Sequence, residues 1–441
     1  MKLLITNTFS GKKELFIPMD AHQITLYVCG ITPYDYAHIG HGRCYVTFDV
    51  LYRLLSKKYT VMYCRNFTDI DDKLINKAKK EYNDETKYRV IADTFIAAYE
   101  KDMRALNCLK PNIEPRVTQH IPEIISFVKQ LIDSGHAYER QGDVYFSLKT
   151  YAEYGKLSKR NLGDMLAGAR VSVNEDKQDP LDFALWKKSD DAVGWESPWG
   201  FGRPGWHIEC SALARKYLGS TIDIHAGGMD LIFPHHENEI AQTESVQAVP
   251  FVRYWMHNAF VRIDQEKMSK SLGNFLTLHD IFEKYSPMAL RYMLLSHHYR
   301  SPLDFSFDDL DVAHTTYQRI CKLFYDTVTT KNSGSTSVAD AMMTYLLDDL
   351  NIPGMLGVFF EHSKEVQEDD SQKIAVKDIF TNILGLSLIP EVKKEIIITP
   401  EIQKLLDARE LARRTKDWQQ SDALRDELKA LGYIVQDKKL T

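Results

Sequence analysis

Residues 29–43, CGITPYDYAHIGHGR, decide the fold of this chain, because they join a buried strand to a helix. The apolar, β-prone run 24–28 ends at this stretch, and a helical pattern follows over about residues 44–57. A second strand is expected over 60–67. Strand, helix and strand in this order form a βαβ unit. The loop before the helix therefore lies at a strand's carboxyl end, where open α/β sheets bind ligands.

The composition is that of a globular enzyme with more than one domain. The chain has 441 residues, 44% of them hydrophobic, which is enough to bury several cores. Its net charge of −6 excludes coating of nucleic acid through bulk charge but leaves a local basic face open. The six cysteines are scattered and form no disulfide framework, which favours a reducing compartment. We expect a cytoplasmic monomer without an export signal or a membrane segment.

The order of the patterns predicts an α/β catalytic domain of Rossmann type that is split by an insertion. Its first half covers residues 1–115, and its second half, which holds a helix near 208–218 and a strand at 222–225, covers 205–280. The insertion, 116–204, contains a helix over 121–134 and a hairpin at Gln141-Gly142. From residue 280 onward the pattern is almost wholly helical, with a region at 281–330, a helical bundle at 338–397 and a small last domain at 398–441. Two amphipathic helices and a short strand at 433–435 are expected in that last domain.

Two short motifs, HIGH at 38–41 and KMSKS at 267–271, indicate a nucleotide site. When a carboxylate attacks the α-phosphate of ATP, negative charge builds on the phosphates, and preorganised donors and cations stabilise it. His38 and His41 can donate to phosphate from a helix start, and Gly40 leaves room for adenine near the backbone. Lys267 and Lys270 lie on a loop that can reach the pyrophosphate. Either motif alone could be a surface loop or an exposed basic turn, but the two together, in this order, favour the nucleotide site.

A second group of residues has the chemistry of zinc ligands. His235 and Glu239 are four residues apart in 234–239, PHHENE, and share one face of a helix that Pro234 is expected to open. Cys29 and Cys210 could complete a tetrahedral set with two thiolates. The spacing alone does not bring the four together. A small buried cysteine or a helix-capping histidine explains each residue equally well.

Several blocks of the sequence resemble the cysteinyl-tRNA synthetase family of class I enzymes. They are residues 29–43, 66–73 (NFTDIDDK), 205–211 (GWHIECS), 225–239 (HAGGMDLIFPHHENE) and KMSKS with the following Leu272-Gly273-Asn274. The resemblance covers nearly the whole chain. It implies a class I synthetase fold, with a connective insertion, a stem-contact region at 281–330 and an anticodon-binding domain at 398–441. The implied reaction is ATP-dependent ligation of L-cysteine to tRNA(Cys) through cysteinyl-adenylate, with Mg²⁺ accompanying ATP.

The resemblance also assigns roles to single residues. It implies one Zn²⁺ on Cys29, Cys210, His235 and Glu239, with the substrate thiolate as a further ligand. Shape alone separates such similar side chains as cysteine and serine by only about 10–200-fold, whereas zinc prefers the soft thiolate, so no editing site is expected. It implies catalysis by His38, His41, Lys267 and Lys270, and ATP contacts at His38, Gly40, His41, Lys267, Ser269 and Lys270. The cysteine pocket would include Thr68, Trp206 and Asp230, although Trp206 could instead be a core indole.

The C-terminal residues implied to contact the anticodon are Arg413, Trp418, Asp422 and Asp437. Bases can stack on an aromatic ring, and carboxylates can accept from base amino groups. Trp418 could instead anchor a helix in a core. The family's Gly-Thr-Trp tail is missing here, and Pro33 replaces the usual Val in the HIGH-region loop.

Three other functions share some of these sequence features. A mycothiol-pathway ligase, which joins cysteine to an amino sugar, shares both motifs and the metal ligands, but it has no anticodon to read. A cytidylyltransferase-like enzyme uses a HIGH-type loop, but PHHENE and the long insertion disfavour it. A zinc-binding module without enzymatic activity would not need two nucleotide motifs.

Overall fold

The computed structural model describes residues 2–160, 177–189, 192–263, 266–267, 275–327, 336–390, 399–415 and 417–430. The chain forms two compact units, Met1–Ile389 and Pro390–Thr441, which are described separately. Ser269, Lys270, Asp437 and the strand expected at 433–435 lie outside the described residues, and of Lys267 only the backbone is described. Within the described residues, no helix is both long and apolar enough to traverse a lipid bilayer.

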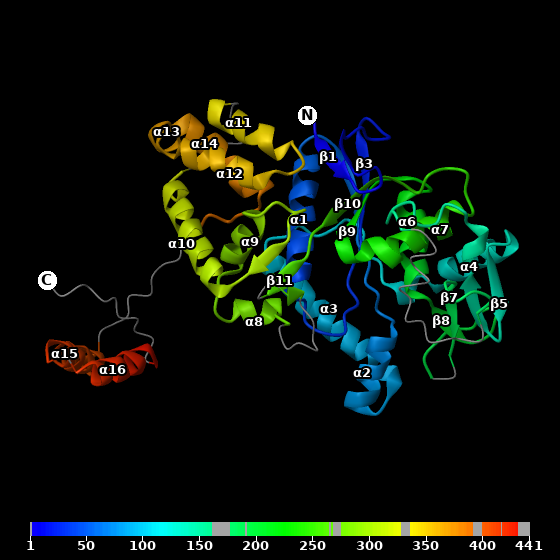
Figure 1. Ribbon diagram of the computed structural model, residues 1–441, viewed down its shortest axis with the longest axis horizontal. Coiled ribbons are helices and arrows are strands. Elements are labelled where there is room, and N and C mark those ends of the chain that lie inside the picture. Colours follow the sequence, from blue (N-terminus) through cyan, green and yellow to red (C-terminus); the bar gives the residue numbers. More distant parts are fainter. Residues whose placement is uncertain are drawn as a thin grey trace. The chain divides into compact units, whose positions relative to one another are not determined.

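The centre of the first unit is a four-stranded parallel sheet (Figure 1). Its strands, in the order β10-β9-β3-β4, are β10 (Val252–Asn258), β9 (Ile222–Gly228), β3 (Gln23–Val28) and β4 (Thr60–Cys64). The chain leaves β3 for β4 on one side, and β9 then pairs with the other side of β3. The carboxyl ends of β3 and β9 therefore form a topological switch point, the usual ligand site of an open α/β sheet. The predicted strand–helix–strand unit is confirmed, although β4 ends at Cys64 and is continued by isolated bridges such as Ile31↔Phe67.

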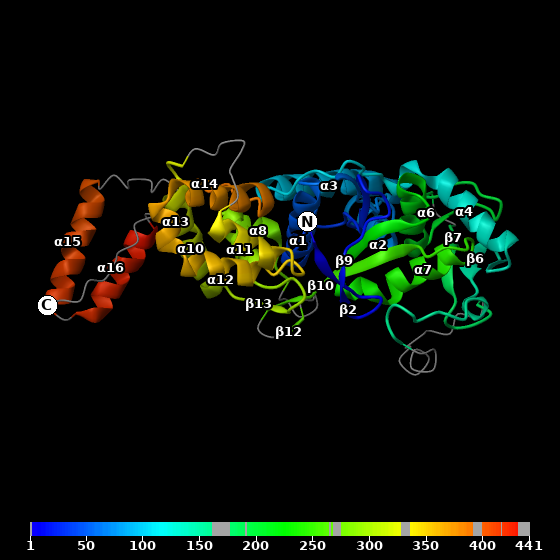
Figure 2. The same ribbon diagram turned by 90° about the horizontal axis from the view of Figure 1, so that it is seen from above.

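Helices cover both faces of this sheet. Both views place α1 (Ile39–Ser56) on one side, and α6 (Trp206–Leu218) and α7 (Glu237–Glu244) on the other (Figures 1 and 2). Because side chains alternate along a strand, Leu26 and Val28 pack in the core with α1, whereas Tyr27 and Cys29 pack in the core with α6 and α7. This alternation directs Cys29 toward the same layer as Cys210.

The segment between β4 and β9 combines helices with a second sheet. Its helices are α2 (Asp72–Tyr82), α3 (Tyr88–Ala105) and α4 (Ile121–Asp133). The antiparallel sheet has the order β5 (Ala137–Arg140), β6 (Asp143–Phe146), β7 (Phe183–Lys188) and β8 (Gly202–Pro204). Arg140 pairs with Asp143 across the turn at Gln141-Gly142, so the predicted hairpin is confirmed.

The second half of the first unit is mainly helical and shares one core with α1. Its helices are α8 (Leu278–Phe282), α9 (Pro287–Leu295), α10 (Phe307–Phe324), α11 (Ser337–Leu346), α12 (Ile352–Glu361), α13 (Ser363–Glu368) and α14 (Asp370–Asp378). The prediction of a nearly continuous helical pattern misses β13 (Leu303–Phe305), which pairs in parallel with β11 (Val261–Ile263). A three-residue strand is too short for its alternation to stand out in a helical region. Near the N-terminus, β1 (Leu4–Asn7) and β2 (Lys12–Leu15) form an antiparallel pair.

The second unit contains the two predicted amphipathic helices, α15 (Pro400–Arg414) and α16 (Trp418–Ala430). Thr399 caps α15 by accepting a hydrogen bond from the backbone N–H of Ile402, and Pro400 occupies its first turn. The first of these two helices therefore begins two residues inside the domain expected at 398–441.

Candidate active site

A cavity of about 390 Å³ opens at the switch point of the parallel sheet. Its walls come from the end of β3 (residues 29–32), the start of α1 (38–41), the end of β9 (228–231) and the link from β10 to β11 (258–261). Trp206, at the start of α6, also lines it. Segments far apart in the sequence thus meet at one place, and the place is where the fold predicts a ligand.

The HIGH histidines form a locally fixed pair at the start of α1. The Nδ1 atom of His38, the N-cap, accepts from the backbone N–H of Gly40 at 3.1 Å. The Nδ1 atom of His41 accepts from the backbone N–H of His38 at 3.2 Å, and the two rings stack with centroids 3.7 Å apart. A neutral imidazole whose Nδ1 accepts carries its proton on Nε2, so both rings are N–H donors. Burial, assisted by the neighbouring His38, holds the pKa of His41 well below its usual value.

These donors stand at a helix start whose first N–H groups, those of Ile39 and Gly40, already donate to Leu276 O and to His38 Nδ1. Such a start attracts phosphate oxygens through the positive end of the helix dipole. His38, Gly40 and His41 all line the cavity. The HIGH segment can therefore receive the phosphates of a nucleotide.

The backbone on both sides of KMSKS is joined to its surroundings. On the near side, Lys267 in β12 (Glu266–Lys267) pairs with Arg262 in β11. On the far side, the N–H of Ile39 donates to Leu276 O at 3.1 Å, and the N–H of Leu278 donates to Ala37 O at 2.7 Å. Phe275 lines the cavity. The chain thus returns from KMSKS directly onto the HIGH segment.

The four expected metal ligands are brought together. One ligand atom of each of Cys29, Cys210, His235 and Glu239 lies within 4.8 Å of the others, and all four side chains are buried. His235 Nε2 lies 3.0 Å from Glu239 Oε1, as their spacing of four residues predicts. The helix itself begins later than expected: α7 starts at Glu237, and Pro234 lies in a preceding π-helical turn, Ile232–His236.

The chemistry of these residues fits a divalent cation. Burial raises the pKa of Cys29 and of Glu239 well above their usual values, and Cys210 raises that of Cys29 further. Burial lowers the pKa of His235. Without a cation the thiol and the carboxyl are held neutral, whereas a metal ion favours the thiolate outright. Two sulfurs, one imidazole and one carboxylate are a four-coordinate set for Zn²⁺.

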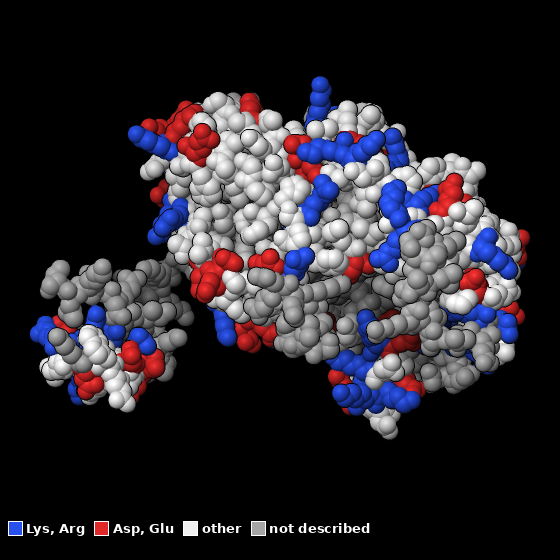
Figure 3. Space-filling model, viewed as in Figure 1, with Lys and Arg blue, Asp and Glu red and all other residues white. Residues whose placement is uncertain are grey.

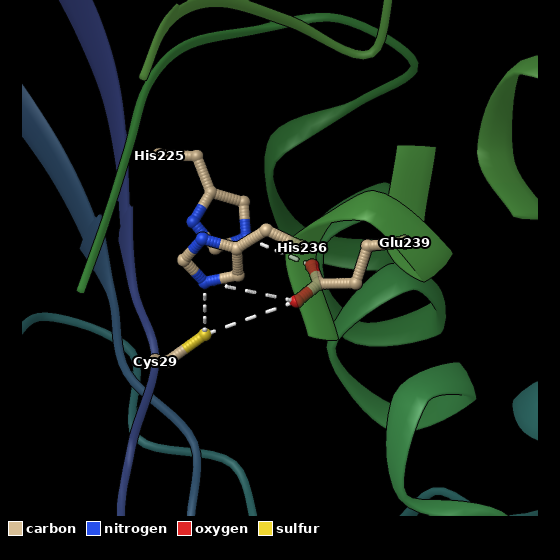
Figure 4. A group of neighbouring side chains, drawn as sticks. All are labelled: Cys29, His225, His236 and Glu239. Carbon is tan, nitrogen blue, oxygen red and sulfur yellow. Dashed lines mark hydrogen bonds and ion pairs between the residues drawn. The ribbon is translucent and has the colours of Figure 1, made fainter. Parts of the chain in front are cut away.

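A second group, which the sequence did not reveal, overlaps the first (Figure 4). It consists of Cys29, His225, His236 and Glu239, whose ligand atoms also lie within 4.8 Å of one another. His225 Nε2 lies 2.8 Å from Glu239 Oε2, and His236 Nδ1 lies 2.8 Å from His257 Nε2. Both groups share the thiol and the carboxyl. Because soft thiolates favour zinc, the first group, with two cysteines, is the better zinc site.

Of the residues expected in the cysteine pocket, two line the cavity and one lies behind it. The Trp206 ring stacks on His235 with centroids 4.4 Å apart and is 43% exposed, so the alternative of a core indole is wrong. Asp230 is exposed at the cavity wall. Thr68 is buried and is not among the lining residues; its hydroxyl donates to Glu209 at 2.8 Å. Burial raises the pKa of Glu209 well above its usual value.

Asn66 holds the end of β3 in place, a role that sequence reasoning missed. Its Oδ1 accepts from the backbone N–H of Gly30 at 3.0 Å and from the Tyr27 hydroxyl at 3.1 Å. A Cβ on Gly30 would lie 1.5 Å from the Asn66 carbonyl oxygen, so only glycine fits there. Asn66 therefore fixes the chain on both sides of Cys29. The NFTDIDDK block contained it, but only the fold shows what it contacts.

The local basic face that the net charge left open lies over α2. Figure 3 shows Lys and Arg side chains gathered there, and α2 contains Lys73, Lys77, Lys79 and Lys80. Lys73 also lines the cavity, with its Nζ 5.1 Å from the centre of the Tyr34 ring. One cationic side chain of this face, Lys73, therefore contributes to the wall of the site.

In the second unit, Trp418 begins α16 and is 55% exposed, so the alternative of a core anchor is wrong. Arg413 lies in the last turn of α15. Asp422 forms an ion pair with Arg425 at 3.1 Å. Both ring and carboxylate are at the surface, where a nucleic acid could reach them.

Comparison with known proteins first defines the class. Residues 15–315 match the family model described as the tRNA synthetases class I (C) catalytic domain. The fold is similar to that of Mycobacterium tuberculosis methionyl-tRNA synthetase in complex with methionyl-adenylate, with a TM-score of 0.59, 15% identity, and coverage of 88% of this chain and 94% of that one. A chain with this sheet, HIGH segment and catalytic-domain match is a class I aminoacyl-tRNA synthetase.

The particular family follows from closer relatives. Residues 398–441 match the Cysteinyl-tRNA ligase anticodon binding domain. The chain is 43% identical to a cysteine--tRNA ligase of Aquifex aeolicus, over 99% of this chain and 97% of the relative, and 46% identical to one of Caldicellulosiruptor saccharolyticus, over 98% and 97%. The chain belongs to the cysteine--tRNA ligase family. The cytidylyltransferase-like and non-enzymatic hypotheses are therefore wrong, and a mycothiol-pathway ligase leaves the match at 398–441 unexplained.

Proposed function

We propose that this enzyme activates L-cysteine with ATP and transfers it to tRNA(Cys) through cysteinyl-adenylate. One observation carries the proposal: a single cavity is lined both by the HIGH donors and by Cys29 of the metal-ligand group. Phosphate chemistry and thiol recognition can then act on one substrate pair. A carboxylate oxygen of cysteine attacks the α-phosphorus of ATP, and the bond to pyrophosphate breaks.

In the adenylation step, the protein supplies donors rather than a covalent intermediate. His38 and His41 donate from Nε2 to phosphate oxygens, while Gly40 gives the nucleotide access to the backbone. Lys267, Ser269 and Lys270 stabilise the pyrophosphate that leaves, together with Mg²⁺ bound to ATP. Each such donor lowers the free-energy barrier by about 3–4 kcal/mol.

Cys29, Cys210, His235 and Glu239 would hold a Zn²⁺ ion that selects cysteine. When bound, this ion would act as a Lewis acid that prefers the thiolate of cysteine to the hydroxyl of serine. Asp230 attracts the substrate ammonium group at the cavity wall, and Trp206 covers the His235 side of the site. Thr68 acts from behind the wall by fixing Asn66 and Glu209 through hydrogen bonds.

The C-terminal unit reads the anticodon of tRNA(Cys), with Arg413, Trp418, Asp422 and Asp437 as contacts. The stem-contact region at 281–330 and the bundle at 338–397 lie between it and the catalytic domain in the sequence. The enzyme acts as a monomer in the cytoplasm.

The test is ATP–pyrophosphate exchange driven by each amino acid, followed by charging. Exchange should require cysteine, and serine should not replace it. Labelled cysteine should then go to tRNA and not to glucosaminyl-inositol, the acceptor of the mycothiol-pathway alternative. Exchange with another amino acid but not with cysteine would refute the proposal. Lys270→Ala should slow adenylation far more than it weakens cysteine binding, and equal effects would remove its transition-state role.

A further inference from the structure

Arg43 is a buried cation two residues after the HIGH motif, on α1. Its side chain is 1% exposed. One terminal nitrogen donates to Ala259 O at 3.2 Å and to Phe260 O at 2.8 Å. The other donates to His298 O at 3.0 Å and to Ser301 O. All four acceptors are backbone carbonyls from two separate connections.

Both connections belong to the walls and supports of the site. Residues 259–260 link β10 to β11 and line the cavity. Residues 298–301 link α9 to β13, the strand that pairs with β11. The two links are joined by a hydrogen bond from the N–H of Ala259 to Tyr299 O at 2.8 Å. Beyond β11 the chain turns into β12, where Lys267 begins KMSKS.

The electrostatics of Arg43 differ from those of a structural ion pair. Among the described residues, no acidic side chain forms a salt bridge with it. Burial lowers its pKa to about 10, so it is charged at neutral pH. A buried cation has a desolvation cost that a well-packed apolar side chain avoids. What the guanidinium adds is direction, because its planar donors fix several acceptors at once.

We propose that Arg43 is a positioning residue that sets the separation between the HIGH histidines and the wall formed by 259–260 and β11. The inference rests on the proposed function, because it assumes that ATP is held between these two sides. Arg43 does not touch the substrate. It fixes the two sides at one spacing, so that the HIGH donors and the wall at 259–260 meet the same nucleotide. A displacement of about 1 Å in such a site can cost about 100-fold in rate.

Arg291 offers a matched control, because it is a second buried arginine that contacts α1. Arg291 on α9 is also fully buried, and it donates to the carbonyls of Leu384 and Leu106 and to the carboxylate of Asp49 on α1. None of these residues lines the cavity. Arg291→Lys therefore disturbs a comparable buried guanidinium against α1, away from the site.

The experiment compares Arg43→Lys and Arg43→Gln with Arg291→Lys in the full chain. A lysine keeps the charge but has three donors on one atom, which cannot span both connections. For each variant, thermal unfolding, zinc content and the kcat and KM of cysteine-dependent exchange are measured well below the unfolding midpoint. We expect the Arg43 variants to lose about 10–100-fold in kcat with zinc content retained and KM for cysteine little changed. Arg291→Lys should lose stability but keep its kcat.

The other possible results separate failure of the positioning role from failure of the proposed function. If wild-type protein exchanges with cysteine but Arg43→Lys and Arg291→Lys have equal kcat values, the positioning role is overturned while the proposed function stands. If both Arg43 variants fail to fold at 10 °C, Arg43 is a structural residue and the inference is equally overturned. If wild-type protein shows no cysteine-dependent exchange, it is the proposed function that fails.

Discussion

The Sγ atom of Cys29 lies 3.1 Å from Nε2 of His236, although 207 positions separate the two residues in the sequence. His236 in turn contacts His257, whose Nδ1 lies 2.7 Å from the Thr8 hydroxyl. The Cys29 thiol therefore belongs to two overlapping sets of possible ligands. One set includes Cys210 and His235, and the other includes His225 and His236. Which set holds the ion can be decided by substitution.

Cys210→Ser and His235→Asn should each remove most of the zinc, because each breaks the set that has two sulfurs. The wild-type protein should retain about one zinc per chain. His236→Asn is the matched control: it alters the adjacent histidine and leaves Cys29, Cys210, His235 and Glu239 intact. Metal analysis after dialysis gives the result, with circular dichroism to verify folding. Loss of zinc in His236→Asn together with retention in Cys210→Ser would place the ion in the second set instead.

His38→Asn should separate the capping role of this residue from its role toward phosphate. Asparagine is a good N-cap, so the free energy of unfolding should change by no more than about 1 kcal/mol. The Nε2 donor is lost, and kcat for exchange should fall by about 100–1,000-fold. Urea unfolding and exchange kinetics measure the two effects, with His38→Ala as the variant that loses both. An unchanged kcat in His38→Asn would remove this histidine from catalysis.

Truncation after Ile389 should impair tRNA charging while leaving cysteine activation intact. The first unit contains the whole cavity, and residues 398–441 match an anticodon-binding domain. We expect the shortened chain to retain cysteine-dependent exchange while its kcat/KM for tRNA charging falls. Trp418→Ala in the full chain tests the same contact by one side chain, and Leu411→Ala, another exposed apolar residue of this unit, is its control. Full charging by the truncated chain would exclude anticodon reading by this unit.

Asp49→Ala should destabilise the first unit without changing its chemistry. The Asp49 carboxylate accepts from Arg291, from Arg53 and from the backbone N–H of Leu109, and it is almost wholly buried. Its removal leaves the Arg291 guanidinium buried without its counter-charge, which costs about 3–5 kcal/mol. Urea unfolding should show this loss. Exchange measured on the folded protein should keep its kcat, and a loss smaller than about 1 kcal/mol would contradict the assigned importance of this pair.

The sequence predicted those features that depend on local order. The run 24–28 and the following helical pattern place Cys29 and HIGH at a strand end, and the four-residue spacing places His235 beside Glu239. The convergence of Cys29 and Cys210 with them came from the family resemblance, because no periodicity relates the end of β3 to the distant helix α6. Roles that depend on long-range contacts, such as those of Asn66 and Arg43, were missed for the same reason. Neither residue type is unusual, and only the fold shows which backbone groups each one holds.

The attachment of both sides of KMSKS to one place has a thermodynamic consequence. The N–H of Ile39 and the carbonyl of Ala37 bind the chain after the motif, and Arg43 binds the chain before it. Folding has therefore already fixed the backbone of Lys267 and of Leu276, and the entropy lost in fixing these two positions is a property of the folded enzyme rather than of the ATP complex. Leu276 is therefore already held against Ile39 of the HIGH segment before any nucleotide arrives. ATP binding does not have to bring Leu276 to the HIGH segment, so the free energy of ATP binding is not reduced by that step.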